Sequence, residues 1–176
     1  MRRLVVAAAI AAAGCKSLAP VRMAVGQPIP MGEHRLTITS VEMGSEGAQR
    51  QLIVHFNYDG PLGDLQGFLT HIKIALKDDA GKWYASLFST PEDLYNYHKT
   101  LKTIDPDRAS ESDLAHLKDI SDRIEQIENE LNAGRNPGRW IRAFKVAEES
   151  RGFTLLVSNP YRVEGQARQI EVPLGR

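Results

Sequence analysis

The stretch QLIVHFNY, residues 51–58, alternates apolar and polar side chains with a period of two. Leu52, Val54, Phe56 and Tyr58 share one face, and the residues between them share the other. A strand that buries one face of an antiparallel sheet has this pattern. The stretch therefore predicts a protein built from antiparallel β-strands.

The same alternation recurs on both sides of this stretch and predicts about seven strands, enough for a β-sandwich. A change of phase at Ser40 predicts a β-bulge. Asp78-Asp79-Ala80-Gly81 is typical of a hairpin turn, because glycine accepts a positive φ. The strands expected at 139–146 and 152–158 are predicted to pair as a second hairpin. The expected strands are residues 36–43, 51–58, 68–77, 82–88, 139–146, 152–158 and 169–174.

Residues 90–134 change to a helical period, which predicts an α-helical hairpin inserted between strands. The first helix is expected to begin with Thr90 as its cap and Pro91 in its first turn. Ser110 and Asp113 have the spacing of a capping box at the start of the second helix. Two roles stay open for this hairpin: covering the sandwich, or projecting from it to recognise a partner.

The N-terminal residues predict that the protein is located in the cell envelope. Two arginines precede an apolar run over residues 4–14, and Cys15 follows it. This order is typical of a secretory signal peptide, and the run is too short to cross a bilayer. The end of the run, Ala12-Ala13-Gly14-Cys15, resembles the lipobox of bacterial lipoproteins, with Ala12 where that family prefers Leu, Val or Ile.

The lipobox resemblance implies cleavage before Cys15, a diacylglycerol on its thiol and an acyl chain such as palmitate on its amine. Lys16 follows the cysteine, and in that family this implies the outer membrane, on the periplasmic side. The alternative is a soluble secreted or periplasmic protein, cut at Ala11-x-Ala13. The strand pattern also resembles the immunoglobulin-like domains of bacterial lipoproteins. The expected parts are a signal peptide over 1–14, the lipidated cysteine and a flexible tether over 15–32, and a sandwich domain over 33–176 with its insertion at 90–134. Within the tether, Val21 to Val25 is either extended linker or an edge strand with Val21, Met23 and Val25 facing inward.

Composition narrows the classes of function. The chain has 22 basic and 22 acidic side chains, and 20 against 22 remain without the two arginines of the signal. A charge so close to neutral gives no electrostatic reason to expect nucleic acid as a partner. The single cysteine is assigned to the lipid, so no disulfide is expected.

No catalytic or metal site is expected from the sequence. The five histidines lack ligand spacing, and His55 and His71 are expected as solvated residues on polar strand faces. Neither a Gly-x-Ser-x-Gly motif nor a glycine-rich phosphate loop occurs. We therefore expect a non-catalytic binding or assembly module without a cofactor, with the lipid bilayer and another envelope protein as partners. The alternatives are an inhibitor or immunity-type lipoprotein of a periplasmic enzyme, and an envelope hydrolase.

Two groups of residues are candidates for partner binding. One follows the helical insertion, where arginine and tryptophan have the composition of interface hot spots. Its alternative is a core position for the tryptophan and ion pairs for the arginines. The other group is on the first inserted helix, where aromatic side chains beside His98 and Lys99 either line a pocket or pack across helix and sheet. The candidates are Arg135, Arg139, Trp140, Arg142, Tyr95 and Tyr97.

Overall fold

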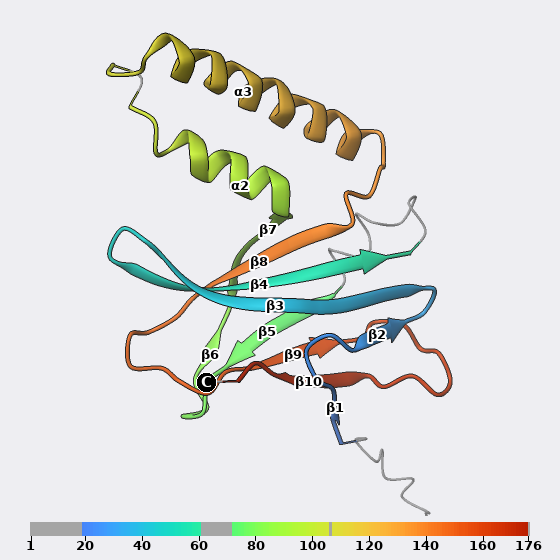
Figure 1. Cartoon of the computed structure of the whole chain (residues 1–176). Coiled ribbons are helices and arrows are strands. Elements are labelled where there is room, and N and C mark those ends of the chain that lie inside the picture. Colours follow the sequence, from blue (N-terminus) through green and yellow to red (C-terminus); the bar gives the residue numbers. More distant parts are fainter. Residues whose placement is uncertain (1–18, 61–71, 106, 176) are drawn as a thin grey trace, which may run out of the picture.

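The computed structural model describes residues 19–60, 72–105 and 107–175. This part of the chain is mainly β, with two sheets of five strands each and two helices (Figure 1). One sheet, sheet A, has the order β1-β10-β9-β5-β6, and the other, sheet B, has the order β2-β3-β4-β8-β7. The elements are β1 (Val21–Arg22), β2 (Pro28–Met31), β3 (His34–Glu46), β4 (Gln49–Asp59), β5 (Lys73–Lys77), β6 (Trp83–Tyr84), β7 (Ser86–Pro91), α2 (Glu92–Leu101), α3 (Glu111–Asn132), β8 (Arg139–Lys145), β9 (Thr154–Ser158) and β10 (Gln169–Pro173).

One hydrophobic core joins the two sheets. The alternation in β4 places its apolar residues in this core as predicted, since Leu52, Val54, Phe56 and Tyr58 are all buried. Sheet A supplies a matching set of buried aliphatic side chains: Ile74, Leu76, Leu155, Val157, Ile170 and Val172. The prediction of a mainly β protein with a helical insertion is confirmed.

The strand count and one strand pairing differ from the prediction. The described part holds ten strands, because β1 and β2 lie within the expected tether and the segment 82–88 divides into β6 and β7 in different sheets. The predicted hairpin of residues 139–146 and 152–158 is wrong. β8 pairs with β4 and β7 in sheet B, whereas β9 pairs with β5 and β10 in sheet A.

The predicted bulge is present in β3. The register between β3 and β4 shifts between Ile38 and Ser40, which leaves one residue of β3 without a register partner. Leu36 and Ile38 before the shift are buried in the core, and Val41 after it packs against the core. The bulge therefore lets a strand that changes phase keep its apolar side on the core.

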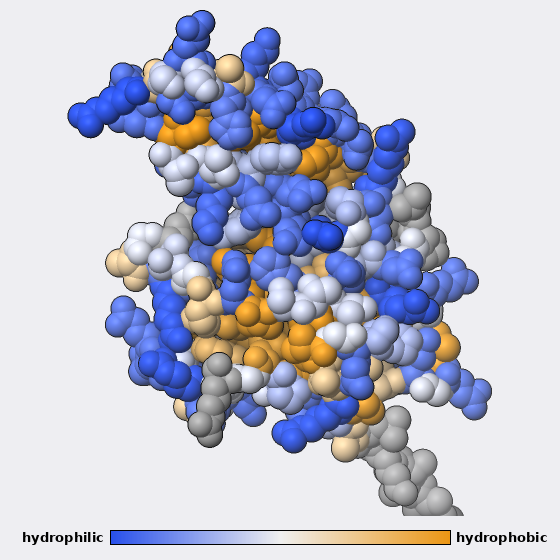
Figure 2. Space-filling view, viewed as in Figure 1, coloured by the Kyte–Doolittle hydropathy of each residue, from blue (hydrophilic) through white to orange (hydrophobic). Residues whose placement is uncertain are grey.

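The insertion forms a helical layer on the outer face of sheet B, consisting of α2 and α3 (Figure 1). α2 contacts β7 and β8, and α3 packs on α2. Under this layer Ile53, Ile141 and Ala143 are buried although they lie outside the core between the sheets. Figure 2 shows apolar side chains gathered where α2 meets α3. No helix in the described ranges combines the length and the apolar character needed to cross a membrane.

The ends of α3 agree with the sequence. Ser110 Oγ accepts a hydrogen bond from the Asp113 backbone at 3.2 Å, and the Ser110 backbone donates to the Asp113 carboxylate at 2.9 Å, a complete capping box. At the other end Gly134 has a φ of 75°, and the Arg135 N–H donates to the Glu130 carbonyl at 2.9 Å. A left-handed glycine with this backbone bond ends a helix in a Schellman motif.

The predicted cap of α2 is wrong. Thr90 belongs to β7 and pairs with Ile141 of β8, so its side chain is not at the helix start. Pro91 is the N-cap and makes no side-chain cap hydrogen bond. The helix follows directly from a strand of sheet B, and this short connection holds α2 against the sheet.

A buried polar cluster joins the β5–β6 turn to the β8–β9 connection. The Asp78 carboxylate accepts hydrogen bonds from the Tyr84 hydroxyl and the Ser150 hydroxyl, each at 2.9 Å, and from the Lys82 backbone at 2.8 Å. Burial acts to raise the pKa of Asp78, but the hydrogen bonds from Lys82, Ser150, Tyr84 and the Ala80 backbone outweigh it, and the pKa is lowered from 3.8. The ionised carboxylate is therefore the form that stabilises the fold.

Replacing Asp78 with asparagine is expected to lower stability at pH 7 and to matter less in acid. Because the pKa of Asp78 is lower in the folded protein than its ordinary 3.8, its contribution is complete above that pH and is lost as the pH falls through the folded-state pKa. Urea unfolding of the wild type and of Asp78→Asn at pH 7 and pH 3 measures this difference. Asp79→Asn, at the exposed neighbour, is the matched control and should unfold close to the wild type. An equal loss for Asp78→Asn at both pH values would contradict the prediction.

Candidate ligand-binding cavity

A cavity of about 530 Å³ lies between α2, β7 and the β3–β4 hairpin. Gln51 and Phe88 of sheet B line it together with residues of α2, so it lies on the outer face of sheet B, on the side that carries the helical layer. Its volume is in the range of about 300–1,000 Å³ that is typical of pockets for small molecules. The lining residues are Ser45, Gly47, Gln51, Phe88, Thr90, Tyr95, His98, Lys99, Lys102 and Thr103.

Two aromatic rings form the apolar part of this cavity. The ring centroids of Phe88 and Tyr95 are 6.1 Å apart, with an angle of 32° between the planes. Phe88 reaches this position through a register shift in β7 between Ser86 and Phe88, which pairs Phe88 with Ala143 of the outer face. Phe88 is nevertheless 36% exposed, a high value for a phenylalanine on a sheet covered by a helix. The helix leaves part of this ring open to the cavity.

A row of basic side chains forms the polar part of the cavity. Three basic residues follow Tyr95 at helical spacing: His98 three positions later, Lys99 four and Lys102 seven. They therefore share one face of α2 with Tyr95, and Lys102 is the C-cap of the helix. Cations are also favoured at a helix C-terminus by the helix dipole. Among the lining residues that the structure describes, none carries a carboxylate. The cavity therefore combines an aromatic wall with a cationic rim.

Three of the four residues predicted on this helix line the cavity, and one does not. Tyr95, His98 and Lys99 are lining residues, whereas Tyr97 is half-buried on the opposite side of α2 and is not among them. The pocket alternative in the sequence therefore corresponds to an actual cavity.

A second, smaller cavity of about 250 Å³ lies beside the start of α2 and contains His55. The imidazole nitrogens lie 3.3 Å from a carboxylate oxygen of Glu92 and 3.7 Å from one of Glu42. The His55 side chain is only 15% exposed, so the expectation of a solvated histidine is wrong. Glu42 and Glu92 come from β3 and α2, and no local sequence pattern predicts that they meet this histidine. His71 lies outside the described residues.

The arginine-tryptophan group after the insertion does not form one patch. Trp140 is 5% exposed and lies in the core, and Arg142 is on the same inner face because its register partner is Val54. Arg139 is exposed on the outer face, opposite Asn57. The alternating strand β8 therefore sends these side chains to opposite sides of sheet B.

Arg142 is a buried structural residue. Its Nε donates a hydrogen bond of 2.6 Å to the hydroxyl of Ser89 in the neighbouring strand β7. Burial lowers the pKa of Arg142 to about 10, which still leaves the guanidinium charged at neutral pH. It cannot contact a partner on the outer face of sheet B.

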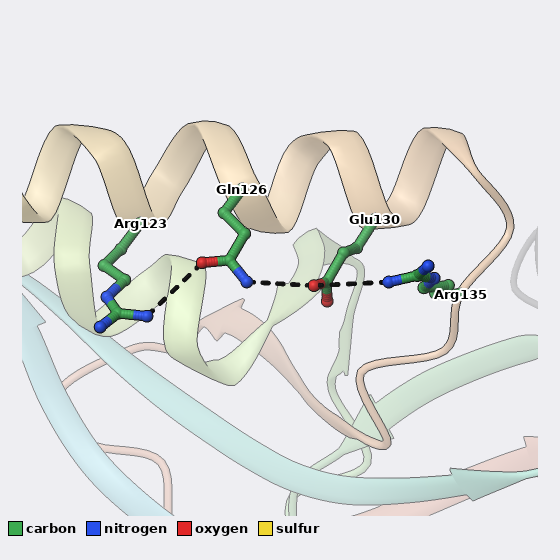
Figure 3. Close-up of polar contacts among 4 residues, drawn as sticks. All are labelled: Arg123, Gln126, Glu130 and Arg135. Atoms are coloured by element: carbon green, nitrogen blue, oxygen red, sulfur yellow. Dashed lines mark hydrogen bonds and ion pairs between the residues drawn. The ribbon is translucent and has the colours of Figure 1, made fainter.

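Arg135 belongs to a polar row along α3 (Figure 3). Its guanidinium lies 3.9 Å from the Glu130 carboxylate, so it pairs with a helix carboxylate, as the alternative interpretation predicted. Gln126 donates to Glu130 at 3.2 Å and accepts from Arg123 at 3.5 Å. The row is solvent-exposed, and exposed pairs of this kind contribute at most about 1 kcal/mol.

Two further predictions concern the lipid anchor and metal binding. Cys15, the predicted lipidation site, lies outside the described residues. Within residues 19–60, 72–105 and 107–175, no group of three or more His, Cys, Asp or Glu side chains has the arrangement of a metal site.

Seven lining residues were not predicted from the sequence: Ser45, Gly47, Gln51, Phe88, Thr90, Lys102 and Thr103. Lys102 could have been found, because it lies one further turn along the helical face that begins at Tyr95. Phe88 could not, because its side depends on the irregular register of β7. Gln51 lines the cavity only because α2 lies over the outer face of sheet B, a tertiary contact with no signal in sequence.

Comparison with protein-family models, with curated proteins and with solved structures gave no match for this chain.

Proposed function

We propose that this protein is a membrane-anchored envelope lipoprotein that acts as a non-catalytic binding module. In this proposal Cys15 carries the lipid, and the cavity beside α2 holds the ligand. One observation supports binding: a single concave site combines an aromatic wall, made by Phe88 of β7 and Tyr95 of α2, with a cationic rim from one face of α2. Binding sites for small molecules have this composition: apolar walls with a few placed polar groups.

The position of the chain start supports an orientation for this module. Val21, the first residue of β1, follows Cys15 by six positions, and a fully extended chain of that length spans about 20 Å. β1 lies at the end of the molecule opposite the helical layer (Figure 1). A lipid on Cys15 would thus hold the β1 end near the membrane and leave α2 and its cavity facing away from it, toward the periplasm.

We also propose that the two sheets are an immunoglobulin-like sandwich. Support comes from two mostly antiparallel sheets with one shared core, and from the passage of the chain from β6 in sheet A to β7 in sheet B. The inserted helices do not interrupt either sheet, since they leave from β7 and return to β8, its paired neighbour.

The proposed function is tested by photocrosslinking in intact cells. The full chain is produced with p-benzoylphenylalanine in place of Tyr95, and crosslinked products are identified by mass spectrometry. A binding module is expected to give a defined adduct at this position, because Tyr95 lines the cavity. The control carries the same group in place of Leu114, which is 52% exposed on α3 and is not a lining residue.

The outcome separates binding from its alternatives. A small-molecule adduct at position 95 but not at position 114 supports the binding module. A single envelope protein captured equally at both positions would favour the inhibitor or immunity-type alternative, with the helical layer as its contact surface. The same weak, unspecific adducts at both positions would contradict a ligand in the cavity.

A further inference from the structure

We propose that the cavity beside α2 takes a small amphipathic organic anion: an apolar body, aromatic or aliphatic, that ends in a carboxylate, sulfonate or phosphate. This inference rests on the proposed function and names the ligand class of the same site. It follows from the chemistry of the two ends of the cavity and from its size.

The apolar end is defined by Phe88 and Tyr95. Their rings lie 6.1 Å apart and are tilted rather than stacked, so they form a wall against which a flat or extended apolar group can pack. Phe88 is among the large apolar side chains left exposed on the described surface. Covering it with an apolar body removes that surface from water, which favours binding.

The charged end is defined by α2. Lys99 presents an ammonium group on the helix face of Tyr95, and His98 precedes it on the same face. Thr90, Thr103 and Gln51 add hydrogen-bonding groups to the lining. The ammonium group of Lys99 gives this end of the site a charge that complements an anion.

The neighbouring cavity on the same face of the sheet has a different lining. Its volume is about 250 Å³, and it is lined by one carboxylate, Glu92, and one guanidinium, Arg139, with His55 3.3 Å from the carboxylate. Its charges are mixed and it lacks an aromatic wall, so an amphipathic anion fits the larger cavity better.

The size of the site limits the ligand to a small molecule. A volume of about 530 Å³ accommodates a bicyclic aromatic acid or a single medium-length acyl chain, and it is within the usual range for small-molecule pockets.

Calorimetric titration of the full lipidated chain in maltoside detergent tests this ligand class, with the heats of protein-free detergent subtracted. The matched probes are 2-naphthoate and 2-naphthamide, which share one ring system and differ in charge. We expect 2-naphthoate to bind at least about fivefold more tightly than the neutral amide. Decanoate is the third probe and has an aliphatic body. Tighter binding of decanoate than of 2-naphthoate indicates that the natural ligand is an aliphatic acid, and the reverse order indicates an aromatic acid.

Variants assign the binding to this cavity. Lys99→Gln is expected to weaken 2-naphthoate about fivefold and to leave 2-naphthamide unchanged. Phe88→Ala is expected to weaken both naphthalene probes about tenfold, because both use the aromatic wall. The control is Lys118→Gln, which removes the same charge from an exposed position of α3 outside the cavity and should bind like the wild type.

Equal affinity of the acid and the amide, or the absence of binding by both anions, overturns the proposed ligand class. So does equal weakening by Lys99→Gln and Lys118→Gln, because it would indicate a diffuse charge effect. A defined adduct at position 95 together with any of these results leaves the binding module standing and rejects only the anion. Failure of the crosslinking experiment instead rejects the binding module itself.

Discussion

Replacing Cys15 with alanine is expected to remove the protein from the membrane fraction, either as a released soluble form or as an unprocessed precursor. The thiol is the predicted point of attachment of the diacylglycerol, and alanine offers no atom for it. Each buried methylene contributes about 0.8 kcal/mol, and two or more acyl chains together give stable anchoring. Loss of the thiol should therefore change membrane association from nearly complete to nearly absent. Fractionation of cells and metabolic labelling with palmitate measure the two parts of this effect.

Ser17→Ala is the matched control, because it makes a change of similar size two positions after the cysteine and leaves the thiol in place. It should keep the protein in the membrane fraction with its label. Palmitate labelling of Cys15→Ala at the wild-type level would show that the lipid is not on this cysteine, and the proposed envelope location would lose its support.

Much of the fold could be predicted because its signals are local. The alternation over residues 51–58 identified which side chains of β4 are buried, and the change of phase at Ser40 identified the bulge. Ser110 with Asp113, and Gly134 at the other end, identified both ends of α3. Each of these features depends on residues within about one helical turn or a few strand positions of one another.

Strand pairing could not be predicted in the same way. Alternation shows that β8 and β9 each bury a face, and both do, but it does not show which strands are their neighbours. Register partners such as Val54 and Arg142 are far apart in sequence. The short pieces β2 and β6 carry too few alternating residues to be recognised, and β1 lies where the sequence left both a tether and an edge strand open, so the expected seven strands fell short of the ten described.

The candidate site could be predicted only in part, because only its helical residues have a local signal. The sequence grouped Tyr95, Tyr97, His98 and Lys99 because they are close together on one helix, and a helix brings Tyr95, His98 and Lys99 onto one face. Tyr97 lies on the other side of α2 and does not line the cavity. The proposed arginine-tryptophan patch failed because β8 is a strand, where adjacent residues point to opposite sides. Trp140 and Arg142 therefore face the core, and Arg139 faces solvent.

Replacing Ile120 with aspartate is expected to separate α3 from α2. Ile120 is 2% exposed and is the one fully buried residue of α3, at the centre of a row of half-buried apolar residues that faces α2. The change removes a packed aliphatic side chain and places a carboxylate in an apolar interface, at a cost of about 3–5 kcal/mol. Limited proteolysis is the measurement: cleavage within residues 107–134 should become at least tenfold faster than in the wild type.

Leu114→Asp is the matched control, since Leu114 is on the same helix but 52% exposed, and its replacement should change proteolysis little. Ile120 lies outside the core shared by the two sheets, so the two sheets of Ile120→Asp are expected to keep their cooperative unfolding while the helical layer opens. Binding of 2-naphthoate by this variant then shows whether α3 supports the cavity. If 2-naphthoate still binds, α2 alone holds the site and α3 serves another purpose; if binding is lost, α3 is needed to hold α2 in place over sheet B. Aggregation of Ile120→Asp, with the sheets unfolding together with α3, would contradict this division and show that the helices cover a core that cannot stand without them.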